Sequence, residues 1–248
     1  MVIILKNLCV DIPIYLQGYD RLLKKPTFLT RSVGANVNIS SKQLSIKAIT
    51  NFNLDIQTGD RIGLLGHNGA GKSTLLKTIA GIIPFSSGEL VVNGKIGCIF
   101  DNGSGFSNEL TGREIIKFYC KINYPNYSYK SILEDILDFT ELGDYIDLPL
   151  RVYSAGMTAR LYAALSTSTT NDILLIDEGI GTGDMAFQKK FVKRLDNYLS
   201  KISTLILASH SLELMAQYCD QGIIIEKGVK IFQGDIKNAI EIYKNGLT

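Results

Sequence analysis

The chain is poor in the residues that define several classes of protein. It has two histidines, and its four cysteines form no Cys-x-x-Cys pair. A histidine-based metal site is therefore not expected. The neighbours of the cysteines are mostly apolar, which favours reduced core thiols in a cytosolic protein over structural disulfides or metal ligands. These residues are Cys9, Cys98, Cys120 and Cys219.

Strong charge and long apolar runs are also lacking. The net charge of +2 is too small to indicate nucleic acid or a strongly anionic surface as a partner. No run reaches the roughly 18 apolar residues that span a bilayer. The apolar start, residues 1–5, is broken at Lys6, Asn7 and Asp11, which predicts a strand and not a signal peptide. A role at a membrane would require another component to hold the chain there.

The sequence has enough apolar material for a large core. Hydrophobic residues make up 46% and charged residues 20% of the 248 positions, which excludes global disorder and suits one domain with a subdomain. We find no internal repeat and no low-complexity tract. Residues 2–12 predict a strand, whereas residues 13–47 show little periodicity and are interpreted as an insertion or long loop.

The remaining chain alternates strands with helices. This order predicts an α/β fold with a mainly parallel sheet covered on both faces, and the helical block 111–167, with breaks near 124–125, 143 and 149, indicates a helical subdomain. Strands are predicted at 48–56, 61–65, 172–176 and 204–208, on both sides of Asn93-Gly94 within 88–100, and as a pair around Lys227-Gly228; further helices are predicted from 72, over 185–199, after 208 and from 235.

A phosphate-binding loop is predicted at Gly66-His67-Asn68-Gly69-Ala70-Gly71-Lys72-Ser73, which fits G-x-x-x-x-G-K-[ST]. Glycines allow successive backbone N–H groups and a helix N-terminus to face phosphate oxygens. Lys72 would reach the β- and γ-phosphates, and Ser73 would coordinate Mg²⁺. The alternative is an ordinary glycine turn before a helix, but the strand before the loop and the helix after it favour a nucleoside triphosphate site. The predicted nucleotide-binding residues are Gly66, Asn68, Gly69, Gly71, Lys72, Ser73 and Thr74.

An acidic pair ends the apolar run at residues 173–176. Buried strands often end in an acid at the solvent edge, and the pair alone would indicate no more than that. Together with a phosphate loop, Asp177 is predicted to hold Mg²⁺, and Glu178 to act as the general base toward the attacking water. His210 follows the predicted strand 204–208 at the position of a γ-phosphate sensor; otherwise it would be a surface histidine.

A short motif, Tyr153-Ser154-Ala155-Gly156-Met157, opens an apolar helical run and would by itself be a helix cap. The order of phosphate loop, pentapeptide, Asp177-Glu178 and His210 resembles the ATP-binding subunit of ABC transporters over nearly the whole chain.

The resemblance implies a P-loop ATPase core with an antiparallel β subdomain and an inserted α-helical subdomain at about 104–167, all within a single domain 1–248. It also implies ATP and Mg²⁺ as cofactors and a head-to-tail homodimer. In such a dimer the signature motif, here Tyr153 to Met157, would close on the γ-phosphate held by the other subunit, and Asp184 would be the D-loop aspartate.

The departures of the motif from Leu-Ser-Gly-Gly-Gln, followed by Arg160, resemble the branch that exports bacterial surface polysaccharides. Four other stretches resemble it too: 10–15, 59–61, 109–114 and 183–187. This likeness implies a separate dimeric membrane permease, a lipid-linked polysaccharide as cargo, and a place at the cytoplasmic face of the bacterial inner membrane. O-antigen is the favoured cargo, with capsule next and teichoic acid after it. Because the chain stops at Thr248, we expect no C-terminal carbohydrate-binding domain.

Two positions differ from the family pattern. Asp101 stands where the Q-loop glutamine is usual, and Ile46 stands near the place of the aromatic residue that stacks on adenine. Tyr15, Tyr19 or Phe28 in the insertion would be substitutes, packing residues or part of a membrane-facing surface. We expect the insertion 13–47 to contact the permease and lipid head groups.

Two further hypotheses belong to other classes. A soluble ABC-type protein acting on ribosomes or DNA would need two fused ATPase halves or coiled-coil arms, and this chain has one phosphate loop, no heptad tract and little net charge. Nucleic acid is therefore not an expected partner. An ABC transporter of drugs or lipids is the remaining alternative.

Overall fold

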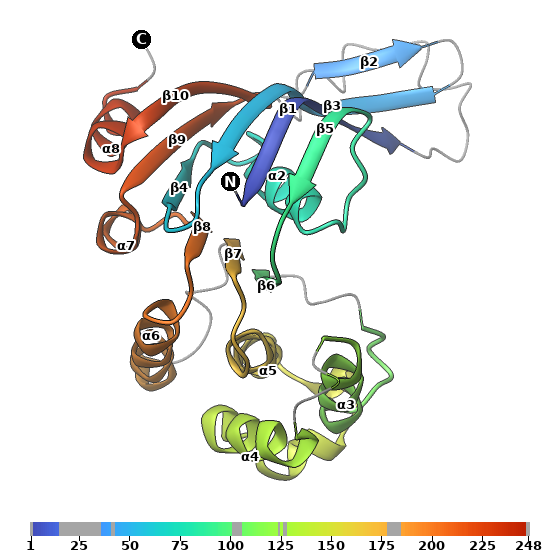
Figure 1. The fold of residues 1–248 in the computed structure, drawn as a ribbon. Helices are drawn as coiled ribbons and strands as arrows, with labels where there is room; N and C mark the ends of the chain where they lie inside the picture. Colours follow the sequence, from blue (N-terminus) through green and yellow to red (C-terminus); the bar gives the residue numbers. More distant parts are fainter. Residues whose placement is uncertain are drawn as a thin grey trace. The chain divides into compact units, whose positions relative to one another are not determined.

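The computed structural model describes residues 2–14, 36–40, 43–100, 106–123, 125, 128–177 and 185–246. The chain forms two compact units (Figure 1). Unit 1 consists of residues 1–94 and 204–248, and unit 2 of residues 95–203. Unit 2 is thus a continuous segment inserted between two segments of unit 1, and it is wider than the helical subdomain expected at 104–167.

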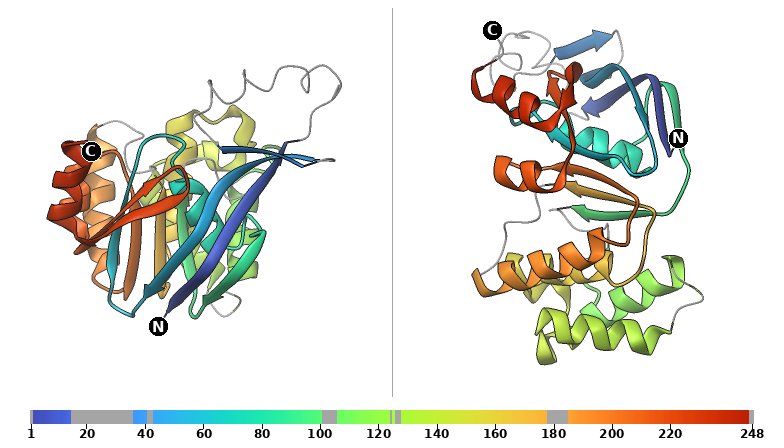
Figure 2. Two further views of the ribbon diagram at one scale, coloured as in Figure 1. Left: turned by 90° about the horizontal axis from the view of Figure 1, so that it is seen from above. Right: turned by 60° about the vertical axis from the view of Figure 1, so that its left-hand side comes forward.

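The first sheet of unit 1 is antiparallel, with the strand order β2-β3-β1-β5 (Figures 1 and 2). Its central strand β1 buries Ile3 and Leu5 and then, after a register shift, Leu8 and Val10. The change from odd to even positions follows from that bulge, because an extra residue turns the side-chain alternation over. The strands are β1 (Ile3–Ile14), β2 (Asn36–Ser40), β3 (Gln43–Ile56) and β5 (Ser87–Val92).

The interpretation of 13–47 as an insertion or long loop is wrong at both of its ends. Strand β1 continues to Ile14, and β3 begins at Gln43 instead of 48. The added residues pair with one another, with Ile12 opposite Ile46 and Ile14 opposite Leu44. Residues 36–40 add a further strand to the same sheet edge. The paired residues of β1 and β3 lie 30 or more positions apart at these ends, which leaves no local signal and explains the error.

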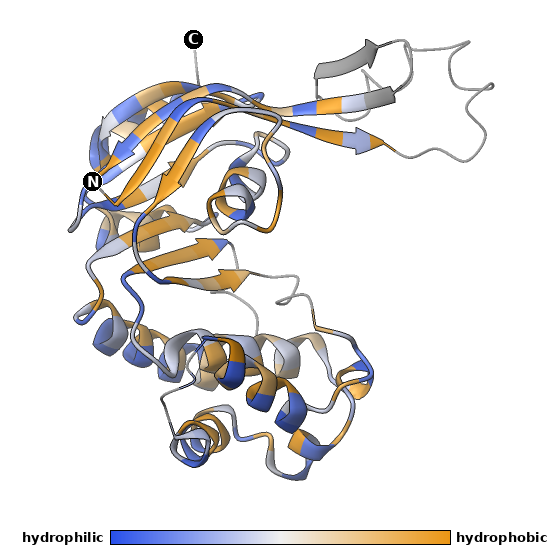
Figure 3. Cartoon of the chain, turned by 45° about the vertical axis from the view of Figure 1, so that its right-hand side comes forward, coloured by the Kyte–Doolittle hydropathy of each residue, from blue (hydrophilic) through white to orange (hydrophobic). Residues whose placement is uncertain are grey.

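The second group of strands in unit 1 is mostly parallel and has the order β10-β9-β4-β8. Strand β4 lies between β8 and β9 and is parallel to both, whereas β9 and β10 form an antiparallel hairpin. Strands β4 and β8 are almost entirely buried, as their mainly apolar sequence predicts. Hydrophobic residues are common in the strands of the chain (Figure 3). The bounds are β4 (Arg61–Leu65), β8 (Thr204–Ala208), β9 (Gln221–Glu226), β10 (Val229–Asp235), α2 (Lys72–Ile79), α7 (Leu212–Tyr218) and α8 (Ile236–Lys244).

Unit 2 contains two parallel strands and the helical block that the sequence predicts. The first helix ends at Asn123, just before the predicted break at 124–125, and the helices are interrupted near 143 and 149 as predicted. The elements are β6 (Ile96–Phe100), α3 (Gly112–Asn123), α4 (Tyr129–Thr140), η2 (Gly143–Asp147), η3 (Leu150–Val152), α5 (Ala155–Thr167), β7 (Ile173–Asp177) and α6 (Met185–Leu199). Across the ranges that the model describes, no helix combines the length and hydropathy needed to cross a membrane.

The strands on the two sides of Asn93-Gly94 are present, but they do not pair with each other. Strand β5 pairs with β1 in unit 1, and β6 pairs with β7 in unit 2. The turn is therefore the place where the chain passes from one unit to the other. A turn dipeptide indicates a change of direction but does not determine which strand becomes the neighbour.

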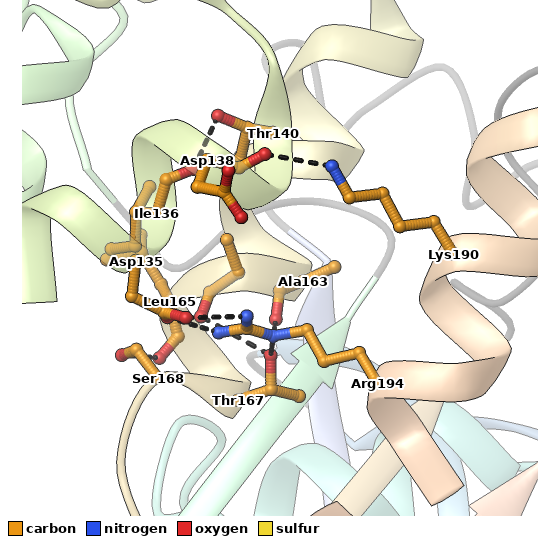
Figure 4. A network of polar contacts seen from close by, with 11 residues as sticks. Asp135, Ile136, Asp138, Thr140, Ala163, Leu165, Thr167, Ser168, Lys190 and Arg194 are labelled. Carbon is orange, nitrogen blue, oxygen red and sulfur yellow. Dashed lines mark hydrogen bonds and ion pairs between the residues drawn. The ribbon is translucent and has the colours of Figure 1, made fainter. Parts of the chain in front are cut away.

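Polar contacts join three helices of unit 2 (Figure 4). From α6, the Arg194 guanidinium donates to both carboxylate oxygens of Asp135 on α4, at 2.9 and 2.5 Å, and to the hydroxyl of Thr167 on α5, at 2.6 Å. It also lies over the ring of Phe139, 4.4 Å from the centroid. One turn away, the Lys190 ammonium donates to the Asp138 carbonyl at 2.8 Å. Arg194 therefore holds α4, α5 and α6 together through one planar group.

Candidate nucleotide-binding site

The predicted phosphate loop lies between the end of β4 and the start of α2, as the motif requires. Its outer residues His67, Asn68 and Gly69 are exposed, while Gly66 and Ala70 are buried. The Ala70 N–H donates to the His67 carbonyl at 3.1 Å, which turns the loop back toward the helix. The loop thus presents backbone around a concave turn at a helix N-terminus, the geometry that favours phosphate.

Two glycines of the loop allow close backbone contacts that no other residue would tolerate. Gly66 has φ 153°, and a Cβ there would collide with the carbonyl oxygen of Ile225 on β9. Gly71 has φ 111°, and its Cβ would lie 2.8 Å from the carbonyl oxygen of Ala48 on β3. Packing against β9 and β3 and the positive φ angles therefore require glycine at both positions.

Lys72 is buried, with 5% of its surface exposed, and its ammonium is held by the loop itself. Nζ donates to the carbonyl of Gly66 at 2.6 Å and to that of His67 at 3.2 Å. A buried ammonium beside the loop places a positive charge where the motif predicts β- and γ-phosphates. Ser73 and Thr74 follow in the first turn of α2, where both are half-buried.

The turn between β9 and β10 supports the loop from the side. The Gly228 N–H donates to the Ala70 carbonyl at 2.9 Å, and the Gly228 carbonyl accepts from Thr50 at 2.9 Å. A Cβ at Gly228 would collide with the Ala48 carbonyl oxygen. The sequence indicated a turn at Lys227-Gly228 but not that it binds the phosphate loop, because that contact joins residues far apart in the chain.

His210 leaves the sheet at the same edge as the phosphate loop. Strands β4 and β8 are parallel, with Leu64 opposite Ala208 in register. Gly66 and His210 each lie two residues beyond that pair, so both follow the carboxyl ends of neighbouring strands. Ligands of parallel α/β sheets bind at this edge. His210 itself is exposed. Ile46, the position expected near adenine, is half-buried on β3, two residues before the Ala48 carbonyl that faces Gly71.

Asp177 is the last residue of β7 in unit 2, where it is buried with 5% exposure and lies opposite Phe100 of β6. A buried carboxylate at the carboxyl end of a parallel strand suits a Mg²⁺ ligand. Glu178 and Asp101, the next residues after this pair, lie outside the described residues, as does Asp184. The same holds for Tyr15, Tyr19 and Phe28.

The predicted signature motif begins helix α5 of unit 2. Ser154 is the N-cap, and its hydroxyl accepts from the Met157 N–H at 3.2 Å. Ser154 and Ala155 are exposed. A Cβ at Gly156 would meet only the Ser154 hydroxyl, at 3.8 Å, so this face of the turn is open. The first turn of α5 can therefore receive an anion.

Tyr153 is fixed by its side chain. Its hydroxyl donates to the Tyr145 carbonyl in η2 at 2.7 Å. Burial, together with the negative charge of Asp147, raises the pKa of Tyr153 to about 12, against a smaller lowering by the hydrogen bond from the Gly112 N–H. The phenol therefore remains a hydrogen-bond donor at physiological pH.

The comparisons with known proteins agree with this geometry. Residues 49–181 match the ABC transporter family model. The O-antigen export system ATP-binding protein RfbE of Yersinia enterocolitica is 39% identical over 92% of this chain and 95% of its own length. The teichoic acids export ATP-binding protein TagH of Enterococcus faecalis is 37% identical over 79% of this chain, which spans 44% of that longer protein.

Among solved structures, the dimeric ATP-binding cassette MJ0796 bound to ADP and Pi shares the fold, with a TM-score of 0.70 at 19% identity, over 94% of this chain and 98% of that one. The chain belongs to the ABC transporter family and has the α/β fold of its ATP-binding cassettes. It is an ATPase subunit of that class of transporter.

Proposed function

We propose that this protein hydrolyses ATP to power the export of a lipid-linked surface polysaccharide, with O-antigen as the favoured cargo. The observation that carries the proposal is the glycine-lined loop around the buried ammonium of Lys72, in a chain similar to an O-antigen export protein over 95% of that protein's length. Capsular polysaccharide and teichoic acid remain the alternatives. The similarity to TagH supports teichoic acid.

ATP would bind with its phosphates along the loop from Gly66 to Thr74. Lys72 would balance charge on the β- and γ-phosphates, and the backbone N–H groups around Asn68, Gly69 and Gly71 would donate to phosphate oxygens. Gly66 and Gly71 fit this role, since side chains at either position would collide with neighbouring backbone.

Hydrolysis would need Mg²⁺ and a base. Ser73 and Asp177 would hold the metal, which neutralises charge that develops on the phosphoryl oxygens. Glu178 would accept a proton from the attacking water, and His210 would contact the γ-phosphate.

Two subunits would complete each site. We propose that Ser154 and the first turn of α5, in the motif from Tyr153 to Met157, close on the γ-phosphate bound by the other subunit. Asp184 would couple the two sites. The exposed Ser154 and the open face at Gly156 support this arrangement. A permease dimer would hold the ATPase dimer at the cytoplasmic face of the inner membrane. Contact with the permease is proposed for the segment 13–47, whose ends belong to β1 and β3, and for the Q-loop position Asp101.

The first test is Glu178→Gln. This variant should bind ATP with wild-type affinity, form dimers in ATP and Mg²⁺, and hydrolyse ATP at least about 100-fold more slowly, because only the base is lost. Calorimetry, sedimentation velocity and phosphate release measure the three quantities. Unchanged turnover would contradict the role of Glu178.

The cargo is tested by deleting the gene and restoring it with wild-type or Glu178→Gln protein. Loss of surface O-antigen with accumulation of lipid-linked polymer inside the cell, restored by the wild type alone, is the expected result. Loss of capsule or teichoic acid instead would select one of the alternatives.

A further inference from the structure

Residues immediately before and within the start of helix α3 brace the segment that leads into the signature motif. The Leu150 N–H donates to the Leu110 carbonyl at 2.9 Å, and the Arg151 N–H donates to the Asn108 carbonyl at 3.0 Å. Thr111 and Pro149 form an isolated antiparallel bridge. The chain from 108 to 111 therefore runs as a short backbone clamp beside 149–151, two residues before Tyr153.

Side chains reinforce this clamp on the neighbouring turn. The Arg113 guanidinium donates to both carboxylate oxygens of Asp147, at 2.6 and 3.0 Å. At the start of α3, the Thr111 hydroxyl accepts from the Glu114 N–H at 3.2 Å, and the Glu114 carboxylate accepts from the Thr111 N–H at 2.9 Å. This reciprocal capping pair fixes where α3 begins, and it thereby fixes Gly112 and Arg113.

Because Gly112 has no side chain, the Tyr153 hydroxyl can lie next to it. A Cβ at residue 112 would lie 2.5 Å from the Tyr153 Oη and 2.9 Å from the Ile146 side chain. Gly112 is buried and does not have a positive φ. Its lack of a side chain is therefore explained by this contact and not by backbone conformation.

Tyr153 is thus held from two sides, directly before the N-cap Ser154. Its N–H donates to the Leu150 carbonyl at 2.9 Å, and its hydroxyl donates to the Tyr145 carbonyl at 2.7 Å. Ser154 is joined to this anchored residue by a single peptide bond, so its position follows that of Tyr153. The position of the hydroxyl and N–H groups in the first turn of α5 therefore depends on Tyr153.

We propose that Gly112, Arg113, Asp147 and Tyr153 are positioning residues that hold the signature motif ready for ATP bound by the other subunit. The inference rests on the proposed function, in which this motif completes the partner's site. The proposal gives a role to Tyr153, the first residue of the motif. It also gives a role to the stretch 109–114, which lies outside the motif. Pre-set geometry raises affinity because less freedom is lost when the two subunits close.

The test is Tyr153→Phe, which removes one hydroxyl, with Tyr145→Phe as the matched control. Tyr145 supplies the accepting carbonyl through its backbone, and its own side chain is 50% exposed. In a Glu178→Gln background with ATP and Mg²⁺, Tyr153→Phe should raise the dimer dissociation constant about five- to tenfold, because the freed motif must be ordered when the two subunits close. Tyr145→Phe should leave it within twofold of the reference.

Kinetics separate positioning from general damage to the fold. With Glu178 intact, Tyr153→Phe should bind ATP as the wild type does and keep its KM for ATP, while its kcat at low protein concentration falls. The rate should recover as the protein concentration rises, since the defect lies in association. A loss of rate that does not depend on protein concentration would overturn the inference.

A second pair of variants covers the case in which Tyr153→Phe folds poorly. Arg113→Gln breaks a pair whose side chains are 41% and 57% exposed, so its cost to stability should be small, yet it should weaken the ATP-dependent dimer. Gly112→Ala, which places a methyl group 2.5 Å from the Tyr153 hydroxyl and so displaces it, should also weaken the dimer.

The outcomes distinguish the two levels of proposal. If the Glu178→Gln reference does not dimerise in ATP, the proposed function fails and this inference with it. If the reference dimerises and the Tyr153→Phe and Arg113→Gln variants dimerise equally well, only the positioning role is overturned.

Discussion

The ammonium of Lys72 lies 2.6 Å from the carbonyl oxygen of Gly66, which directly follows β4 and begins the phosphate loop. The Lys72 side chain, at the start of α2, thus links the end of the loop to its first residue. The ammonium that would meet phosphate also stabilises the loop that surrounds it.

Lys72→Met should therefore affect both catalysis and stability. We expect ATP turnover to fall at least about 100-fold, because a charge on the transferred phosphoryl group is left unbalanced. The free energy of unfolding without nucleotide should fall by about 1–3 kcal/mol, because the buried carbonyl of Gly66 loses its donor. Phosphate release and urea unfolding measure these effects. Lys77→Met, on the same helix, is the control and should change turnover and stability little. Equal effects of the two variants would contradict the role proposed for Lys72.

The glycines of the loop should tolerate alanine unequally. Gly66→Ala places a Cβ against the Ile225 carbonyl oxygen, whereas Gly69→Ala meets no atom within 4 Å. Both positions have positive φ, so each variant should lose about 1–2 kcal/mol of unfolding free energy from backbone strain. Gly66→Ala should lose clearly more because of the collision. Urea unfolding of the pair isolates the packing contribution, and similar losses would show that β9 does not restrict the loop.

The contact between Arg194 and Asp135 should matter more than surface ion pairs. The Arg194 side chain is 17% exposed and makes three hydrogen bonds to α4 and α5. Asp135→Asn should therefore cost about 1–3 kcal/mol of unfolding free energy. Glu89→Gln, which breaks a pair with Lys6 between side chains 67% and 62% exposed, should cost less than about 0.5 kcal/mol. Chemical denaturation gives the comparison, and a reversed order would contradict it.

Stability should fall in alkali, and the buried thiol of Cys219 should cause part of this decrease. Burial raises the pKa of Cys219 from about 9 to about 12. Between these values the unfolded chain loses the proton and the folded chain keeps it, so the unfolding free energy decreases as pH rises. The contribution is fully present below pH 9. Cys219→Ala should make this decrease shallower in urea unfolding series from pH 8 to 10.5, and an unchanged slope would exclude Cys219 as the cause.

Thiol reagents offer an independent check of the same property. At pH 8 Cys219 should react far more slowly in the folded protein than in urea, because the thiolate is the reactive form and it is scarce when the pKa is about 12. Mass spectrometry after brief labelling identifies the modified residue. Rapid labelling of Cys219 in the native protein would indicate that α7 opens readily.

Local patterns predicted the elements that carry the site. The phosphate loop was expected between a strand and a helix, and β4 and α2 flank it. The predicted strand 204–208 and helix 185–199 agree with β8 and α6. These predictions succeeded because each depends on apolar periodicity or on turn residues within a few positions. The sites at Glu178, Asp184 and Asp101 stay predictions, since they lie outside the described residues.

Nonlocal pairing accounts for the errors. Nothing near residues 43–47 indicates that they pair with β1, and nothing near Asn93-Gly94 indicates that its two strands join different sheets. Gly112 was noted as part of a resembling stretch, but its contact with Tyr153 needs two segments some 40 residues apart to meet.

The sequence by itself determined the motif residues and their spacing, and from these it predicted a phosphate loop before a helix, an acidic strand end and a signature motif. Only the tertiary structure decided which distant residues each of these segments contacts. Gly66 faces the Ile225 carbonyl, Gly71 faces that of Ala48, and Tyr153 reaches the turn beside Gly112. Such contacts depend on close packing between distant segments, and no local pattern encodes them.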